Sequence, residues 1–545
     1  MANRKGAAFY DDDDFDDGYD DDDYDDDYWD EDDDQYADRE YIPAPEVSSK
    51  PLVKHNLKPK AQDKTETKNS KVASEMKTLA VSNNGEFRND AGLQSLCDQA
   101  AAEESSSGGK TMLNLVVLGH VDAGKSTLMG RMLYETGVVG DKEISKAQKE
   151  AKAIGKGSFA WAWMLDERPE ERSRGVTVDV AMAHFETPHK RVTLLDAPGH
   201  RDFVPNMISG ASQADAAFVV IDGSEGGFES GMSSANIANP LGGGQTREHI
   251  QLAQSLGIEQ IVVVITKLDT CSDPKSRFSY IKESMEDFMQ KSGYDTVNKI
   301  QWTLAVGLTG DNIIELPTSE SLQWYKGPTL IEAIDSLESP QRTVDEPLRL
   351  SVTEASGKGS KNVIVSGKVH QGAFKVGTKV KFIPPGEEGT IKSISAKSRA
   401  THVARAGDSV EATVTVSDPS LIHAGSVMCS KTHPIKLASS FTARITVLDI
   451  VIPLLHGQNV TLHAHATRGT GVITKILSLV DEHTDEVKKE RPRCLLKGQA
   501  AIVEIKPSQP MPLEAFGQCK SLARVALRDG GRTLAVGKVL HIHTE

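Results

Sequence analysis

A glycine-rich loop at residues 119–127 constrains the fold of this chain more than any other stretch. It reads G-H-V-D-A-G-K-S-T and matches the pattern G-x-x-x-x-G-K-[ST]. An apolar run at 112–118 precedes it, and leucine and methionine recur at helical spacing after it, which predicts strand, loop and helix in that order. Backbone amides of such a loop bind phosphate oxygens. The candidate phosphate-binding residues are Gly119, His120, Val121, Asp122, Ala123, Gly124, Lys125, Ser126 and Thr127.

Apolar runs alternate with helical patterns between residues 111 and 340. Runs at 192–195, 216–221 and 261–265 indicate buried strands, and stretches such as 249–256, 278–291 and 329–337 indicate helices. This alternation predicts an α/β domain with a mostly parallel sheet. Ligands of such sheets bind at the carboxyl ends of the strands, which is where the glycine-rich loop lies. Residues 233–241 look like an insertion within this region.

The sequence pattern changes after Pro340, where short β-rich runs are separated by glycine turns. This pattern predicts two β-barrels, at 341–433 and 434–545. The predicted fold class is therefore an α/β P-loop domain at 111–340 followed by two β-barrel domains, with a disordered acidic tail before them.

The acidity of the chain belongs to its first 40 residues, which hold 20 acidic and three basic side chains, whereas the whole chain has a formal charge of -16. Such a composition cannot form a core, so 1–45 is predicted to be disordered and 46–110 to be a flexible linker, with one short helix near 91–104 left open. A solubilising tail and a tether for a basic surface both remain open. Five scattered cysteines, no leader pattern and no long apolar run predict a soluble, cytoplasmic protein without a membrane segment.

Two further motifs predict phosphate and metal chemistry. Asp196-Ala197-Pro198-Gly199-His200 follows a predicted strand, and Asp196 is positioned to hold the water shell of Mg²⁺. The Gly199 amide can sense a γ-phosphate. Thr177 is expected to close on Mg²⁺ as part of a switch segment, beside the Ser126 hydroxyl.

The base of the nucleotide is expected to bind where two later strands end. Thr266-Lys267-Leu268-Asp269 follows the run at 261–265, and the Asp269 carboxylate can accept both N1–H and N2–H of guanine, which adenine does not offer. Lys267 is expected to pack on the base. The segment Val306-Gly307-Leu308 is placed to present a backbone amide to guanine O6. These residues predict GTP rather than ATP as the nucleotide.

This ordered set of motifs resembles the translational GTPases over residues 111–545. The resemblance implies a GTP-binding domain with two barrels, GTP or GDP and Mg²⁺ as cofactors, and GTP hydrolysis stimulated by the ribosome. It also implies that His200 orients the attacking water, and that Val121 and Val176 form an apolar gate that restrains it. Core packing is the alternative role of these two valines.

Two residues depart from the family pattern. Thr266 stands where the family usually has Asn, and so lacks the amide that contacts the base and braces the phosphate loop. Val306 stands where the family usually has Ser, and lacks the hydroxyl that supports the guanine loop. Each lost hydrogen bond is worth roughly 0.5–1.5 kcal/mol, so weaker GTP binding is expected, not its loss.

Within the family the chain looks most similar to the Hbs-like ribosome-rescue branch. Arg174-Gly175-Val176-Thr177 differs from the release-factor branch, and Pro205-Asn206-Met207-Ile208 differs from the elongation branch. The resemblance implies a Pelota-type release-factor-like partner, delivered to the small subunit and GTPase-activating centre of a ribosome, and a monomeric chain. Two alternatives remain open: a non-hydrolysing adaptor that links ribosomes to RNA decay, and a carrier of aminoacyl-tRNA.

Overall fold

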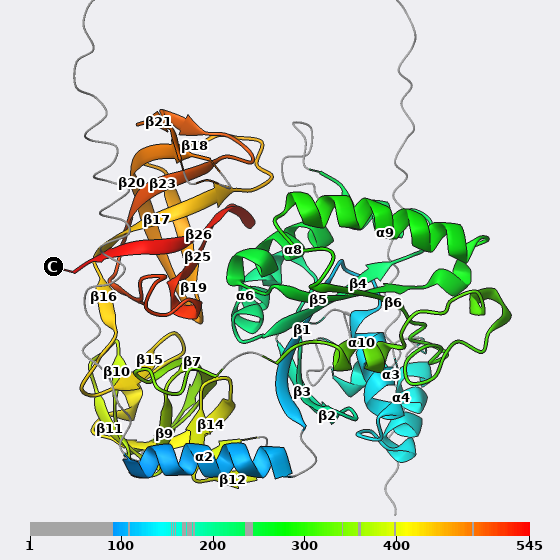
Figure 1. Ribbon diagram of the computed structural model, residues 1–545, viewed down its shortest axis with the longest axis horizontal. Coiled ribbons are helices and arrows are strands. Elements are labelled where there is room, and N and C mark those ends of the chain that lie inside the picture. Colours follow the sequence, from blue (N-terminus) through cyan, green and yellow to red (C-terminus); the bar gives the residue numbers. More distant parts are fainter. Residues whose placement is uncertain are drawn as a thin grey trace, which may run out of the picture. The chain divides into compact units, whose positions relative to one another are not determined.

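The computed structural model describes most of the chain after residue 90 (Figure 1). The predicted tail, most of the predicted linker and most of the predicted insertion lie outside the described residues. Among the residues described, no helix is long and apolar enough to cross a bilayer. The described residues are 91–106, 110–153, 155, 157, 160–165, 171, 177, 180–234, 244–339, 342–357, 361–396, 399–481, 484 and 486–544.

Six strands form one sheet in the order β2-β3-β1-β4-β5-β6, and all neighbours except β2 and β3 run parallel. The strands predicted from apolar runs are all present, because a strand covered on both faces reads as a continuous apolar run. The strands are β1 (Thr111–Gly119), β2 (Ala181–Glu186), β3 (Lys190–Asp196), β4 (Ala216–Asp222), β5 (Gln260–Thr266) and β6 (Ile300–Leu304).

Helices cover both faces of this sheet (Figure 1). Side chains of α6, α8 and α9 share one buried cluster with Val116 and Leu118 of β1, while α3 and α10 share another with Leu113, Leu115 and Val117. The sequence predicted α8, α9 and α10, although α8 and α9 each begin four residues earlier than expected. The helices are α3 (Lys125–Glu135), α4 (Asp141–Ala153), α6 (Val204–Ser212), α7 (Gly227–Met232), α8 (Gln245–Leu256), α9 (Pro274–Lys291) and α10 (Leu330–Asp335).

A first barrel follows, with strand order β10-β15-β7-β8-β14-β11-β12 closed by pairing of β10 with β11, and a separate β9–β13 pair. Alternate residues of its strands point inward and form one apolar core. The strands are β7 (Arg349–Ser356), β8 (Asn362–Gln371), β9 (Ala373–Lys375), β10 (Lys379–Ile383), β11 (Glu388–Ala396), β12 (Arg399–Thr401), β13 (Val403–Arg405), β14 (Ser409–Val416) and β15 (Val427–Ser430).

A second barrel has the order β19-β25-β26-β17-β23-β20-β21, closed by pairing of β19 with β20. Two short pairs, β16–β24 and β18–β22, flank it. The strands are β16 (Lys436–Ala438), β17 (Ser440–Val447), β18 (Leu454–Leu455), β19 (Asn459–Ala464), β20 (Thr467–Val480), β21 (Val487–Glu490), β22 (Cys494–Leu495), β23 (Ala500–Pro507), β24 (Met511–Leu513), β25 (Arg524–Asp529) and β26 (Arg532–His543).

The predicted fold class, an α/β P-loop domain followed by two β-barrels, is confirmed, whereas the domain boundaries stay predictions. Helix α2 (Ala91–Ser106) lies within the stretch predicted to be a linker. Its Leu93 and Cys97 are buried against Ala373 of β9 and Val403 of β13. The helix thus covers the β9–β13 pair of the first barrel.

Candidate functional site

The phosphate loop joins the carboxyl end of β1 to the first turn of α3. Gly124, with φ at 86°, makes the left-handed turn that opens the helix. The Lys125 ammonium lies inside the loop, where it donates to the carbonyls of His120 at 2.8 Å and Gly119 at 3.2 Å. Burial lowers the pKa of Lys125 to about 8. The loop thus holds a cation in a space shaped by backbone groups.

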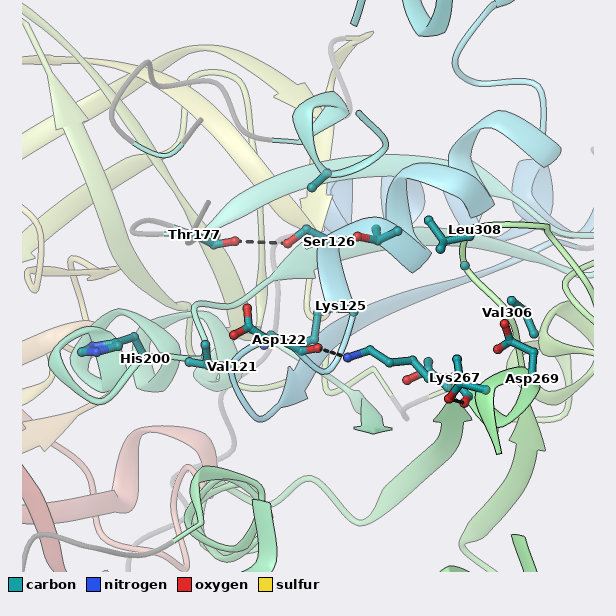
Figure 2. Close-up of a pocket in the computed structure, with 17 residues that line it drawn as sticks. Val121, Asp122, Lys125, Ser126, Thr177, His200, Lys267, Asp269, Val306 and Leu308 are labelled. Atoms are coloured by element: carbon teal, nitrogen blue, oxygen red, sulfur yellow. Dashed lines mark hydrogen bonds between the residues drawn. The ribbon is translucent and has the colours of Figure 1, made fainter. Parts of the chain in front are cut away.

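The three candidate metal ligands lie together beside this lysine. The Ser126 hydroxyl donates to Asp196 Oδ2 at 2.8 Å, and lies 3.1 Å from the Thr177 hydroxyl (Figure 2). Asp196 ends β3 and is fully buried, and its Oδ1 has no hydrogen-bond partner in the described part of the chain. Burial raises the pKa of this carboxyl to about 6, while the charge of Lys125 opposes the rise. Hydroxyl and carboxylate oxygens with an unused acceptor suit Mg²⁺.

Gly199 closes the phosphate end of the site. A Cβ at this position would lie 2.4 Å from Lys125 Nζ and 3.2 Å from the Gly119 carbonyl oxygen. Any larger residue at position 199 would therefore have to push the Lys125 ammonium aside. This close approach places the Gly199 backbone beside the space that a terminal phosphate would fill.

His200 follows directly, and its imidazole points away from Lys125 and Ser126, with Val121 beside it (Figure 2). Its Nδ1 accepts the Asp202 backbone N–H at 3.3 Å, and its ring centroid lies 5.8 Å from that of Phe203. The side chain is 45% exposed to solvent. His200 also lines a neighbouring cavity of about 340 Å³ next to α8 and β26. Val176, the other valine of the expected gate, lies outside the described residues.

The base end of the site follows β5. The Thr266 hydroxyl is within hydrogen-bond distance of the Ala123 carbonyl at 2.8 Å and the Ile221 carbonyl at 3.0 Å. The Lys267 ammonium donates to the Asp122 carbonyl and to an Asp222 carboxylate oxygen, both at 2.6 Å. These contacts fix the lysine stem along the pocket wall.

Asp269 lies in the 3₁₀ turn Leu268–Thr270 and is exposed to the pocket (Figure 2). Its carboxylate is thus placed to accept hydrogen bonds from a base. Beyond β6, Val306 is buried, and its amide donates to the Asp311 carbonyl at 3.1 Å. The Leu308 carbonyl accepts from Arg131 Nη1 at 3.1 Å.

One cavity of about 420 Å³ gathers most of the predicted residues. Four of them do not line it: Gly119, His120 and Ala123 belong to the back of the loop, and Asp196 lies beneath Ser126. Two lining residues, Ala162 and Thr270, had no signal in the sequence. The predicted residues that line the cavity are Val121, Asp122, Gly124, Lys125, Ser126, Thr127, Thr177, Gly199, His200, Thr266, Lys267, Asp269, Val306, Gly307 and Leu308.

Comparison with known proteins decides the family. Residues 110–340 match the elongation factor Tu GTP binding domain, and residues 440–540 match the GTP-eEF1A C-terminal domain-like family. Protein HBS1 of Drosophila melanogaster is 38% identical over 506 residues, covering 92% of this chain and 72% of that protein. The chain belongs to the translational GTPases. Elongation factor 1-alpha of Ignicoccus hospitalis is 41% identical over 437 residues, covering 79% of this chain and 96% of that protein.

Solved structures of translational GTPase relatives share the fold. The GTPase-like domain of Saccharomyces cerevisiae Ski7, bound to GDP and inorganic phosphate, superposes with a TM-score of 0.63 at 18% identity, covering 80% of this chain and 99% of that one. The translation elongation factor SelB from Methanococcus maripaludis, in complex with a GTP analogue, gives a TM-score of 0.55 at 19% identity, covering 80% of each chain.

The resemblance to Hbs-like translational GTPases is confirmed, and the chain is a GTPase. The HBS1 match spans 506 residues, whereas the elongation factor 1-alpha match quoted above spans 437. GTP or GDP with Mg²⁺, predicted from the motifs, are the cofactors of this family.

The expected loss of the phosphate-loop brace in this translational GTPase is wrong. Thr266 lacks an amide, but its hydroxyl reaches the Ala123 carbonyl at 2.8 Å and so ties β5 to the loop. At Val306, a backbone hydrogen bond takes the place of the missing side-chain hydroxyl: the Gly310 amide donates to the Val306 carbonyl at 2.8 Å. The guanine loop is therefore held by backbone bonds.

Sequence reasoning missed two residues of α8 that hold the phosphate loop from behind. The Val121 amide donates to Gln245 Oε1 at 3.1 Å, and the Gly119 amide donates to His249 Nδ1 at 3.3 Å. His249 is fully buried, and burial lowers its pKa to about 3, so it stays neutral and able to accept. Their i, i+4 spacing on one helix face was the only signal in the sequence.

Proposed function

We propose that this chain binds GTP and Mg²⁺ in the 420 Å³ cavity and hydrolyses GTP on stalled ribosomes, where it delivers a Pelota-type release-factor-like partner. One observation carries the proposal: motifs that are far apart in the sequence, from Val121 to Leu308, line the same cavity. The residues proposed to contact the phosphates, the metal ion and the base lie along this cavity in the order that a nucleotide requires (Figure 2).

At the phosphate end, the loop amides and Lys125 bind the β- and γ-phosphates. The two hydroxyls of Ser126 and Thr177 hold Mg²⁺, and Asp196 supports it through a water molecule. The unpartnered Asp196 Oδ1 supports this assignment, because a buried carboxylate oxygen without a donor is costly unless a ligand or water completes it.

At the base end, Asp269 selects guanine through its two Watson–Crick donors, and Lys267 packs on the ring. The Gly307 and Leu308 segment presents a backbone amide to O6. The exposed carboxylate of Asp269 and the clamped ammonium of Lys267 support these roles.

His200 orients the attacking water after it turns toward the phosphates. In the structure its Nδ1 is bonded to the Asp202 amide and the ring points outward, which is a resting position. Ribosome binding supplies the change of orientation, so intrinsic hydrolysis is slow. This arrangement follows the water-positioning logic of phosphoryl transfer.

The two barrels supply the docking surfaces for the ribosome and the partner protein. Residues 345–433 hold 12 basic and 8 acidic side chains, and residues 434–545 hold 15 and 10, an excess of positive charge that suits nearby rRNA phosphate. The similarity to HBS1 over most of the chain supports ribosome rescue as the setting. A cytoplasmic location and a monomeric state belong to the same proposal.

Single-turnover GTP hydrolysis tests this proposal. The purified chain is mixed with empty-A-site ribosomes, with and without the Pelota-type protein, beside a His200→Ala variant. Stimulation by ribosome plus partner, lost in the variant, is expected. GTP binding without any stimulated hydrolysis would overturn the proposal in favour of a non-hydrolysing adaptor.

The cargo is tested separately. Immobilised GTP-bound protein is offered the Pelota-type protein and aminoacyl-tRNA in competition, and retention of the protein alone is expected. Retention of aminoacyl-tRNA instead would identify an elongation-factor-type carrier.

A further inference from the structure

The Thr266 hydroxyl has a single proton, and two protein carbonyls compete for it. Two carbonyl oxygens lie within reach, that of Ala123 in the phosphate loop and that of Ile221 in β4. Thr266 itself is only 3% exposed. A hydroxyl can donate only once, so whichever carbonyl it chooses, its donor capacity is used inside the protein.

Two further side chains beside Thr266, those of Lys267 and Thr270, also donate to groups of the protein. Lys267 Nζ lies 2.6 Å from both the Asp122 carbonyl and an Asp222 oxygen, which pins it along the wall. The Thr270 hydroxyl donates to the Lys267 carbonyl at 2.7 Å. The Thr266 side of the base pocket therefore has no uncommitted hydroxyl donor among these residues.

Guanine presents different groups on its two edges. The Watson–Crick edge carries the donors N1–H and N2–H, which match the Asp269 carboxylate, and the acceptor O6, whereas the major-groove edge carries the acceptors O6 and N7. An asparagine at position 266 would have two amide protons, one for the loop carbonyl and one for the base. Threonine has one proton, and a protein carbonyl of Ala123 or Ile221 takes it.

We propose that Thr266 makes this nucleotide site indifferent to N7 of the purine, so that it accepts guanine nucleotides in which N7 is absent. The proposal rests on the guanine site described above and narrows it: among the described residues, Asp269 and the 307–308 segment supply the selectivity for guanine. The substrate class extends to 7-deazaguanine nucleotides.

Competition binding tests this. GDP and 7-deaza-GDP are titrated against a fluorescent GDP analogue bound to the full chain with Mg²⁺, and the ratio of their Kd values is measured. A ratio within about twofold of one is expected for the wild-type protein. A wild-type ratio above about fivefold would overturn the proposal, because some donor then reads N7.

Two variants at the same position provide the matched controls. Thr266→Val keeps the shape and removes the proton, so both nucleotides should weaken by the same factor and the ratio should stay near one. Thr266→Asn should raise the ratio by about 2- to 13-fold, the worth of one neutral hydrogen bond. An Asn variant with an unchanged ratio would overturn the role of position 266. Failure of the wild-type protein to bind either nucleotide would overturn the guanine site itself.

Discussion

Gly199 has a measurable role at the residue scale, because its hydrogen atom faces the Lys125 ammonium. In Gly199→Ala the new Cβ would lie 2.4 Å from Lys125 Nζ and displace it from the loop carbonyls. Losing a hydrogen bond from this ammonium to a phosphate costs about 1.5–3 kcal/mol, so GDP affinity should fall by about 10- to 150-fold. Gly140→Ala is the control, since a Cβ there meets nothing within 4 Å. Equal GDP affinity of the two variants, measured by titration, would contradict this role.

His249 couples the stability of the chain to pH. Its pKa is lowered from 6.5 to about 3 by burial, so between these values the unfolded chain binds a proton that the folded chain does not. Stability should therefore fall as pH drops below 6.5, by up to about 1.4 kcal/mol per pH unit from this group. His249→Gln keeps an acceptor for Gly119 without the titration. Urea unfolding at pH 7, 6 and 5 should show a shallower loss in the variant, and parallel curves would disprove the linkage.

A site residue could be predicted where its contacts are close in the sequence, and was missed where its contact partner is far away in the sequence. The phosphate loop, Asp196 and Asp269 were predicted because each belongs to a short motif that follows an apolar run. The hydrogen bond from the Gly119 amide to His249 was missed because the two residues are 130 positions apart in the sequence. The Thr266 brace was misjudged because the residue type alone does not say where a hydroxyl will point.

Helix α2 makes a testable contact at the scale of one element. Cys97 is buried between α2 and the β9–β13 pair, and burial raises the pKa of its thiol, so it should react slowly with iodoacetamide. Leu93→Asp places a charge in this contact and should speed Cys97 labelling at least tenfold, as read by peptide mass spectrometry. Gln99→Asp puts the same charge on the exposed side of α2 and should change nothing. Equal rates in both variants would show that α2 does not shield Cys97.

Elements differ in how well the sequence predicted them, for a physical reason. Strands with an apolar run were found directly, as for β5 (Gln260–Thr266), whereas the short parallel strand β6 (Ile300–Leu304), which includes Gln301, was not. The closure of each barrel depends on one long-range pairing, β10 with β11 or β19 with β20, which no local pattern specifies. The start of α8 at Gln245 was missed because three glycines precede it and hide the periodicity.

Buried ion pairs join the folded regions at the scale of the whole molecule. Lys368 of β8 donates to Asp215, before β4, at 2.6 Å, and the same carboxylate accepts from the Asn114 side chain at 2.8 Å. The two barrels are joined in the same way, by Arg349 of β7 and Glu514, with Nε to Oε1 at 2.8 Å. Charges taken out of water at such joints stabilise the chain only while both partners remain.

The Arg349–Glu514 pair gives the sharpest test at this scale. Its side chains are 9% and 6% exposed, and Arg349 also donates to the His433 carbonyl at 2.8 Å. Glu514→Gln keeps the shape but leaves the arginine charge buried, so the free energy of unfolding should fall by about 3–5 kcal/mol. Arg349→Met combined with Glu514→Gln removes both charges and should cost less than either single variant. Urea unfolding of the four proteins measures this, and a double variant as unstable as the sum of its parts would show that the pair does not act as a unit, because independent sites add whereas coupled charges do not.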